Sequence, residues 1–238
     1  MKPAPGPVPP IDLPDGRSLP VSVRLSERAK RVALRLAPSG EAVELVVPRR
    51  TSLATAYGFL ESRRGWVVAQ AMRVPPRVPF ADGALIPYLG QPHALTAVGA
   101  GGTRKSFWIG DGRIEVTGAP EHLARRTRDG LRERARRLLG EKTEATATRL
   151  GRRVAAVAVG DASSRWGSCA ASGRIRYSWR LILAPERVVD YVVAHEVAHL
   201  AEMNHSHRFW RVVESLHVAW REDRAWLSRH GRQLQRYG

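Results

Sequence analysis

Residues 195–199 have the sequence His-Glu-Val-Ala-His, and a further histidine, His205, follows six residues after His199. Two histidines four positions apart lie one turn apart on the same face of a helix, so their ring nitrogens can converge on one metal ion. The neighbouring apolar residues, at positions 192–194 and 200–201, predict that this helix is buried. The motif therefore predicts a metal-binding helix at the centre of the fold.

The third metal ligand has more than one candidate. We expect the metal helix to run from about Pro185 to Met203, so that His205 lies beyond its end. Asn204 can adopt the left-handed backbone conformation that would turn His205 back towards the metal. Glu202, three residues after His199, could also bind the metal or support a ligand, and Glu214 on the following helix is a weaker candidate.

We expect His195, His199 and His205 to bind one zinc ion per chain, because three protein ligands and one open position are typical of catalytic zinc. Glu196 lies beside the first ligand, where its carboxylate can act as a general base towards a water molecule activated by zinc. The alternative is a buried helix without a metal. That alternative would bury two histidines and a glutamate at a cost of several kcal/mol unless they were paired.

Short alternating segments predict that the N-terminal half of the chain is rich in β-structure. A helix beginning after Ser52 interrupts this region, and no internal repeat is evident. We expect residues 1–17, which contain six prolines, to be a mobile tail. The expected strands lie at residues 21–25, 32–36, 43–47, 85–89, 93–98, 106–109 and 113–116.

The C-terminal half has a different pattern, in which helices predominate. A long apolar stripe predicts a helix from about residue 120 to 150. A short strand, a polar loop at residues 163–169 and a second strand at residues 174–179 precede the metal helix. Two more helices, at about residues 207–216 and 220–230, are expected to end the chain.

The sequence around the motif resembles the YgjP-like metallopeptidase-domain family, which is related to the SprT-like zinc peptidases. The resemblance is most specific at residues 195–200, 204–206 and 209–210, and in the preceding segments 164–169 and 177–185. It implies an α+β fold. A β-rich N-terminal subdomain with one helix, residues 18–118, would be followed by a zincin-like metallopeptidase domain, residues 119–238, with a small sheet, the metal helix and C-terminal helices.

The segment before the metal helix contains candidate substrate contacts. In zincin-like sheets an edge strand near the metal can pair with an extended substrate backbone, and residues 174–179 are the candidate for that strand. Arg165 could donate hydrogen bonds to an oxyanion, to Glu196 or to Asp190. The candidate substrate-binding residues are Arg165, Trp166, Arg174 and Tyr177, with loop packing as the alternative for the first two.

The chain of 238 residues has a formal charge of +17, which favours polyanionic partners such as DNA or RNA. Only four of its 39 basic residues are lysines, so the arginine-rich coding bias of a GC-rich genome is an alternative explanation. The proline-rich N-terminus lacks the apolar stretch that a signal peptide would have. No segment is apolar enough to span a membrane, and Cys169 is the single cysteine. We therefore expect a cytoplasmic protein.

These observations favour a zinc-dependent metallopeptidase or related hydrolase that acts on a protein or peptide. One alternative is a nucleic-acid-associated protein, including a SprT-like protein that acts on DNA-bound proteins. Another alternative is a non-catalytic zinc module, in which the protein itself fills the open zinc position.

Overall fold

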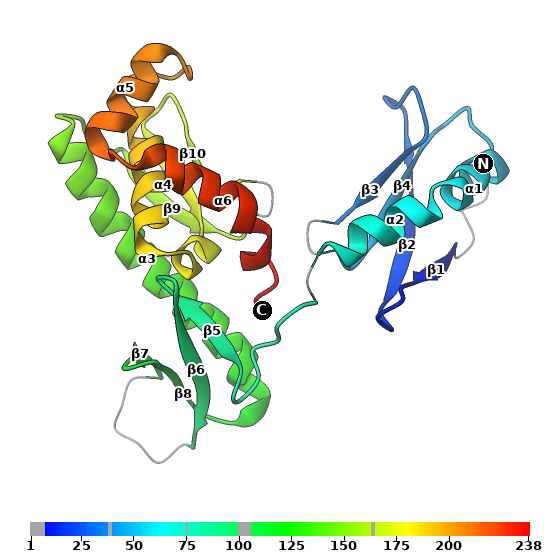
Figure 1. The fold of residues 1–238 in the computed structure, drawn as a ribbon, viewed down its shortest axis with the longest axis horizontal. Coiled ribbons are helices and arrows are strands. Elements are labelled where there is room, and N and C mark those ends of the chain that lie inside the picture. Colours follow the sequence, from blue (N-terminus) through cyan, green and yellow to red (C-terminus); the bar gives the residue numbers. More distant parts are fainter. Residues whose placement is uncertain (1–7, 38–39, 75, 100–105, 163–164) are drawn as a thin grey trace. The chain divides into compact units, whose positions relative to one another are not determined.

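The computed structural model describes residues 8–37, 40–74, 76–99, 106–162 and 165–238. The fold is α+β, with a β-rich N-terminal region and helices towards the C-terminus, as the sequence predicted. The chain forms two compact units, residues 1–77 and 78–238, which are described separately (Figure 1). Among the described residues, no helix is both long enough and apolar enough to cross a membrane.

The first unit is a four-stranded sheet with two helices. Its strands are β1 (Val8–Asp12), β2 (Ser18–Ser26), β3 (Ala33–Leu36) and β4 (Val43–Pro48), in the spatial order β1-β2-β4-β3. The central pair, β2 and β4, is parallel, and both outer pairs are antiparallel. The predicted single helix is two helices, α1 (Leu53–Ser62) and α2 (Arg64–Met72), because the backbone leaves the helical conformation at Arg63 (φ −110°, ψ 3°).

Part of the predicted mobile tail belongs to this sheet. Residues 8–12 form β1, which pairs with β2, and Ile11 is buried in the core of the unit. Proline composition suggested disorder there, but burial of the apolar residues Ile11 and Leu13 stabilises the strand. Residues 1–7 of that predicted tail lie outside the described residues.

The second unit begins with another four-stranded sheet. Its strands are β5 (Leu85–Tyr88), β6 (Gln91–Val98), β7 (Phe107–Gly110) and β8 (Arg113–Thr117), in the order β5-β6-β8-β7. The central pair is again parallel and the outer pairs antiparallel. The two sheets thus repeat one topology that the sequence did not reveal, and the predicted boundary at residues 118 and 119 falls inside the second unit.

A 27-residue helix, α3 (Leu123–Arg149), follows a short 3-10 turn, η1 (Pro120–His122). Its buried residues recur every four positions, which is the spacing of one helix face. This face packs against β7 and β8 near its start and against β9, η2 and α4 further along (Figure 1). The buried residues of α3 are Leu123, Thr127, Leu131, Ala135, Leu139, Thr143 and Ala147.

A three-stranded sheet lies beside α3. It consists of β9 (Ala156–Gly160), β10 (Gly167–Cys169) and β11 (Arg174–Ser178), in the order β10-β11-β9. The sequence predicted a loop at residues 163–169, but its last three residues form β10 and pair with β11. This pairing makes β11 the central strand, so the predicted edge strand at residues 174–179 is not an edge.

The chain ends with helices packed around this sheet. A 3-10 segment, η2 (Trp179–Leu183), leads to α4 (Glu186–Ala198), which carries the metal motif. Two amphipathic helices follow, α5 (His207–Leu216) and α6 (Trp220–Leu234), and both pack against α4. The metal helix is therefore enclosed by α3, α5, α6 and β10.

Candidate metal centre

The helix α4 is buried on nearly every side. Its apolar residues fill the space between the neighbouring helices and the sheet, so the polar residues of the motif are held in a closely packed setting. The helix ends at Ala198, five residues before the predicted end at Met203, and hydrogen-bonded turns continue to Glu202. Its buried residues are Val188, Val189, Tyr191, Val192, Val193, Ala194, Glu196, Val197 and Ala198.

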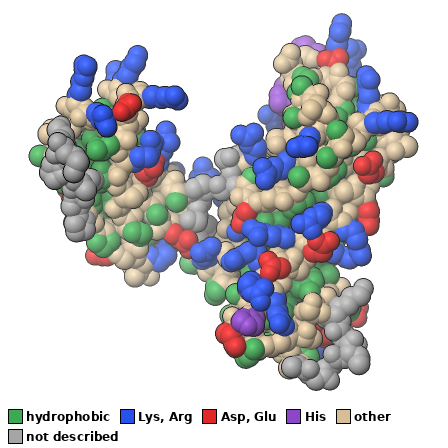
Figure 2. Space-filling view, turned by 180° about the vertical axis from the view of Figure 1, so that it is seen from behind, with side chains coloured by type: hydrophobic (Ala, Val, Ile, Leu, Met, Phe, Trp, Pro, Cys, Tyr) green, Lys and Arg blue, Asp and Glu red, His purple; other side chains and the backbone are tan. Residues whose placement is uncertain are grey.

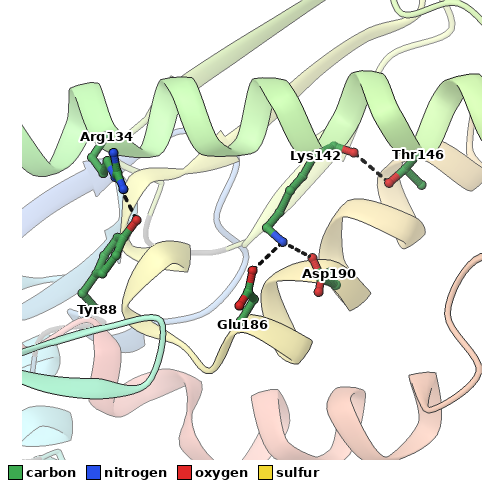
Figure 3. Close-up of polar contacts among 6 residues, drawn as sticks. All are labelled: Tyr88, Arg134, Lys142, Thr146, Glu186 and Asp190. Atoms are coloured by element: carbon green, nitrogen blue, oxygen red, sulfur yellow. Dashed lines mark hydrogen bonds and ion pairs between the residues drawn. The ribbon is translucent and has the colours of Figure 1, made fainter. Parts of the chain in front are cut away.

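An ion-paired lysine fixes α4 on α3. Lys142 on α3 donates to Glu186 at 2.8 Å and to Asp190 at 2.7 Å, both on α4 (Figure 3). Burial favours the neutral amine, but the hydrogen bonds to Asp190 and Glu186 outweigh it and raise the pKa of Lys142. Asp190, which the sequence analysis considered as a partner of Arg165, thus accepts a hydrogen bond from Lys142 through Oδ1.

Three histidines converge beside the end of α4. His195 lies in its last turn, His199 is its C-terminal capping residue, and His205 comes from the following turn. One nitrogen from each ring lies within 4.8 Å of the others, and the Nε2 atoms of His195 and His205 are 3.0 Å apart. Two ligands of a tetrahedral zinc with bonds of about 2.0–2.1 Å are roughly 3.3 Å apart, so the cluster is close to the size that the metal requires.

The backbone reaches His205 by a different route from the predicted one. Among the described non-glycine residues, only Leu89 and Asp111 have positive φ, so Asn204 is not left-handed. The Ser206 N–H instead donates to the Asn204 carbonyl at 2.7 Å, and the Ser206 side chain caps α5 by accepting from the Phe209 N–H. This tight turn and the helix cap together place His205 opposite α4.

Glu202 contributes through its backbone rather than its carboxylate. Nδ1 of His199 lies 3.1 Å from the Glu202 carbonyl oxygen. A proton on Nδ1 would then donate to this carbonyl and leave Nε2 with a lone pair for the metal. Glu214, the weaker candidate, pairs with Arg221 at 2.9 Å, and neither glutamate belongs to the three-residue cluster.

The electrostatics of the cluster favour neutral imidazoles, the form that binds metals. Burial, followed by the proximity of His199 and His205, lowers the pKa of His195 to about 3. Burial also lowers the pKa of His199. Nδ1 of His195 is buried without a hydrogen-bond partner, which is a costly arrangement for a ring that only filled space. Three imidazole nitrogens at this spacing fit a metal such as zinc.

Glu196 points towards β10 rather than towards solvent. A Cβ atom on Gly167 would lie 2.5 Å from Oε1 of Glu196, so only glycine at this strand position leaves room for the carboxylate. Burial raises the pKa of Glu196 to about 7, although the positive charge of Arg165 opposes the change. The carboxylate is therefore held between the metal helix and the edge of the sheet.

A buried aspartate that the sequence analysis missed supports the other side of the centre. Asp223 on α6 is fully buried, where it forms an ion pair with Arg187 and lies 2.7 Å from Nε2 of His217. The ring of Tyr191 packs 6.3 Å from that of His217 and 6.0 Å from that of His195, measured between centroids. The signal in the sequence was an aspartate three residues after Trp220, on the apolar face of an amphipathic helix.

Aromatic rings complete the surroundings of the three histidines. Phe209 on α5 lies with its centroid 4.5–4.9 Å from those of His195, His199 and His205. Trp210 is next to it and stacks on Trp220 at 4.3 Å. These rings limit the orientations that the imidazoles can adopt.

The four candidate substrate residues occupy different environments. Arg165 is exposed and acts electrostatically on Glu196, so it lies near the centre. Trp166 is half-buried and packs against Gly231 of α6, which supports the packing alternative. Arg174 is exposed at the start of β11, beyond the turn of the β10–β11 hairpin.

Tyr177 lies inside the core. It is 1% exposed, and its hydroxyl lies 3.0 Å from that of Thr143 on α3. Burial raises the pKa of Tyr177 above its ordinary value. Because its side chain projects from the face of the sheet that packs on α3, Tyr177 holds the sheet on this helix and does not reach solvent.

Comparison with known proteins identifies a family for this arrangement. The family model described as "YgjP-like, metallopeptidase domain" matches residues 30–230. This range includes the helices α4 and α5 and all three histidines of the centre. Neither a curated protein nor a solved structure matches the chain.

Proposed function

The chain belongs to the YgjP-like, metallopeptidase-domain family, and we propose that it is a zinc-dependent peptidase whose ligands are His195, His199 and His205 and whose general base is Glu196. The observation that carries this proposal is the convergence of three imidazole nitrogens within 4.8 Å next to a buried carboxylate. Family membership supports a hydrolase in general, and the arrangement of these four side chains supports the specific roles.

The choice of zinc follows from the donor atoms. Three imidazoles without a thiolate or a carboxylate suit zinc, and three protein ligands leave one position for water or substrate. When bound, zinc supplies Lewis-acid chemistry, because it polarises an oxygen ligand and lowers the pKa of a water molecule to about 7.

Glu196 is suited to hold and transfer a proton. It follows the ligand His195 directly, and Gly167 lets its carboxylate approach the backbone of β10. Tight packing restricts its movement, so the carboxylate is oriented before substrate arrives. The positive charge of Arg165 lies near the same carboxylate, where it can balance negative charge that develops during the reaction.

The edge strand β10 is the site where we expect an extended substrate to pair. β10 lies at the edge of its sheet and contacts α4, whereas β11 has neighbours on both sides. Unpaired backbone groups on an edge strand can bind a peptide by β-augmentation. A protein or peptide would then lie with its backbone close to Glu196, with Arg165 as a side-chain contact.

A non-catalytic zinc module has less support. Such a module would need the protein to close the fourth position, but among the described residues the cluster contains three ligand side chains. Glu202 offers only its carbonyl to His199, and Glu214 pairs with Arg221. A cytoplasmic location is part of the proposal, on the ground of the single cysteine, Cys169.

The experiment that tests this function compares Glu196→Gln with a matched variant, Glu202→Gln. Quenched fluorescent casein is the substrate, and zinc content is measured for every sample. Loss of the base should reduce the rate about 10²- to 10⁴-fold while zinc is retained, because general-base catalysis contributes about that much. Glu202→Gln should keep both zinc and activity, since its side chain is outside the cluster. Wild-type activity in zinc-loaded Glu196→Gln would refute the role of Glu196.

A further inference from the structure

Two arginines on α6, Arg221 and Arg224, are similar in their immediate surroundings. Both are exposed, and each guanidinium lies near a tryptophan ring. The guanidinium carbon of Arg221 is 4.5 Å from the centre of the Trp220 ring. That of Arg224 is 4.9 Å from the centre of the Trp210 ring. Contact with an aromatic ring restricts the orientations of a guanidinium, whose N–H groups can still donate hydrogen bonds to a ligand.

The two arginines differ in their ionic partners. Nη1 of Arg221 lies 2.9 Å from Oε1 of Glu214 on α5. Within the part of the chain that the structure describes, no carboxylate pairs with Arg224. Lys and Arg side chains are spread over the face of the second unit that Figure 2 shows, with Asp and Glu side chains among them, so an unpaired arginine is not unusual by itself. The position of Arg224 is what distinguishes it.

The ring beside Arg224 belongs to the wall of the metal centre. The centre of the Trp210 ring is 5.8 Å from those of His195 and His205. His205 is the exposed member of the three histidines, so the centre is accessible to solvent on the side where Trp210 lies. Among the described residues, the Trp220 ring contacts Trp210 but none of the three histidines. A ligand that approaches His205 from solvent therefore comes close to Arg224.

The charge of Arg224 also reaches the centre. After burial and the two neighbouring histidines, Arg224 is a further cause that lowers the pKa of His195. Burial raises the pKa of Tyr191 to about 12, and the positive charge of Arg224 opposes this rise. The other nearby arginine, Arg165, acts on Glu196 instead. Because the three histidines supply no negative charge, an anionic group of a ligand would be favoured beside Arg224.

We propose that Arg224 binds a carboxylate of the substrate beside the metal centre and so selects peptides with a negative charge close to the bond that is cleaved. This inference rests on the peptidase function proposed above. A guanidinium matches a carboxylate because two parallel N–H groups can donate to its two oxygens. A peptide has two sources of this group, the side chains of Asp and Glu and the C-terminal carboxylate, and both would make the same contact.

Binding of small metal ligands to the zinc-loaded protein tests the inference without a cleavage reaction. The monohydroxamates of succinic and suberic acid combine a zinc-binding group with a carboxylate on a short or a long chain, and the corresponding terminal amides are uncharged controls. Calorimetry with the wild type should find at least one acid that binds about tenfold more tightly than its amide. This is the lower end of what charge-assisted hydrogen bonds contribute, because the arginine is exposed.

Variants on α6 assign the preference to a residue. Arg224→Gln should remove the preference for the acid and bind the amide almost as the wild type does. Arg221→Gln is the matched control, since it removes the same charge from the same helix beside Trp220, and it should keep the preference. Arg224→Lys should keep part of it, because lysine retains the charge but not the paired N–H groups. Zinc analysis and circular dichroism establish that each variant is loaded and folded, and the comparison of acid with amide in the wild type stays decisive if one is not.

Peptide cleavage distinguishes the two sources of the carboxylate. A mixture of casein peptides is incubated with wild type or Arg224→Gln, and the cleaved bonds are identified by mass spectrometry. A preference for Asp or Glu beside the cleaved bond, lost in Arg224→Gln, would assign the carboxylate to a side chain. Release of C-terminal residues from free peptides but not from their amidated forms, again lost in Arg224→Gln, would assign it to the C-terminus.

Three outcomes would overturn the inference. Equal affinities of the acids and their amides for the wild type would show that no carboxylate is bound near the metal. A preference that persists in Arg224→Gln would belong to another residue. Equal loss of the preference in Arg221→Gln would attribute it to the overall charge of α6. Failure of the wild type to bind zinc, or to bind any of the hydroxamates, would instead contradict the proposed function itself and this inference with it.

Discussion

The chain forms two four-stranded sheets of the same topology, and the two sheets differ in the helices that follow them. The first sheet packs on the short helices α1 and α2, and its described core residues all come from the first unit. The second packs on α3, and its buried residues share one core with those of the metal helix. The second sheet therefore shares a core with the metal helix because α3 is long enough to pack against both, whereas the short helices α1 and α2 pack against the first sheet.

The largest effects should come from substitutions in the two cores. Leu45 in the first sheet and Leu95 in the second are both fully buried, so alanine at either position should lower the free energy of unfolding by about 2–5 kcal/mol. Leu45→Ala should leave zinc affinity unchanged, whereas Leu95→Ala should weaken zinc retention on heating. Calorimetry together with zinc analysis measures both effects. Equal loss of zinc in both variants would contradict the conclusion that only the second sheet supports the metal helix.

A smaller effect is expected from one glycine in each unit. Gly167→Ala brings a Cβ atom against the Glu196 carboxylate, and displacement by about 1 Å can cost about 10²-fold in rate. Gly65→Ala on α2 meets nothing within 4 Å and should leave the rate unchanged. Steady-state hydrolysis by the two variants, with zinc content as a check, is the measurement. Wild-type activity in Gly167→Ala would show that Glu196 does not need its position at β10.

The smallest effect concerns one ion pair in each unit. Lys142→Met removes the partner of Glu186 and Asp190 and should cost about 1 kcal/mol, because all three groups are partly exposed. Arg24→Met, which removes the exposed pair with Glu44 across β2 and β4, should cost less than about 0.5 kcal/mol. Denaturant titration measures both, and a larger loss for Arg24→Met would contradict the ranking.

The pH dependence of the Lys142 variant has a definite sign. The pKa of Lys142 is raised in the folded protein, so its contribution is complete below the ordinary lysine value of 10.5. The contribution is lost as pH rises through the higher folded value. The difference between wild type and Lys142→Met should therefore be constant near neutral pH and shrink only in strongly alkaline solution.

The sequence predicted the helix that carries His195 because spacing on a helix is a local property, and it placed His199 one turn further along. The prediction of His205 depended instead on a turn at Asn204 and on the family resemblance. The sequence analysis missed the end of that helix and the turn at Asn204, since the cap at Ser206 and the contact between His199 and the Glu202 carbonyl form only when the chain folds back.

The sequence analysis also misjudged Tyr177. Residues 167–169 looked like a loop, and their pairing with β11 makes that strand central. Tyr177 is buried because α3, which is distant in the sequence, packs on the face of the strand from which its side chain projects.

The sequence also did not reveal that the two sheets share one topology, because this topology depends on pairing between distant segments. Both copies depend on a parallel pairing between strands that are not consecutive, β2 with β4 and β6 with β8. Alternation of apolar residues predicts strands but does not specify their partners. The boundary between the units, which depends on how α3 packs against β7 and β8, could not be predicted from composition.

Zinc content tests the central claim most directly. Wild-type protein and His207→Ala, which alters an exposed histidine two positions after His205, should each contain about one zinc ion per chain after dialysis, as one three-histidine site requires. His205→Ala should lose the metal to a chelator at concentrations that leave the other two proteins loaded. Zinc retained equally by His205→Ala and the wild type, or no zinc in the wild type, would contradict a centre formed by His195, His199 and His205.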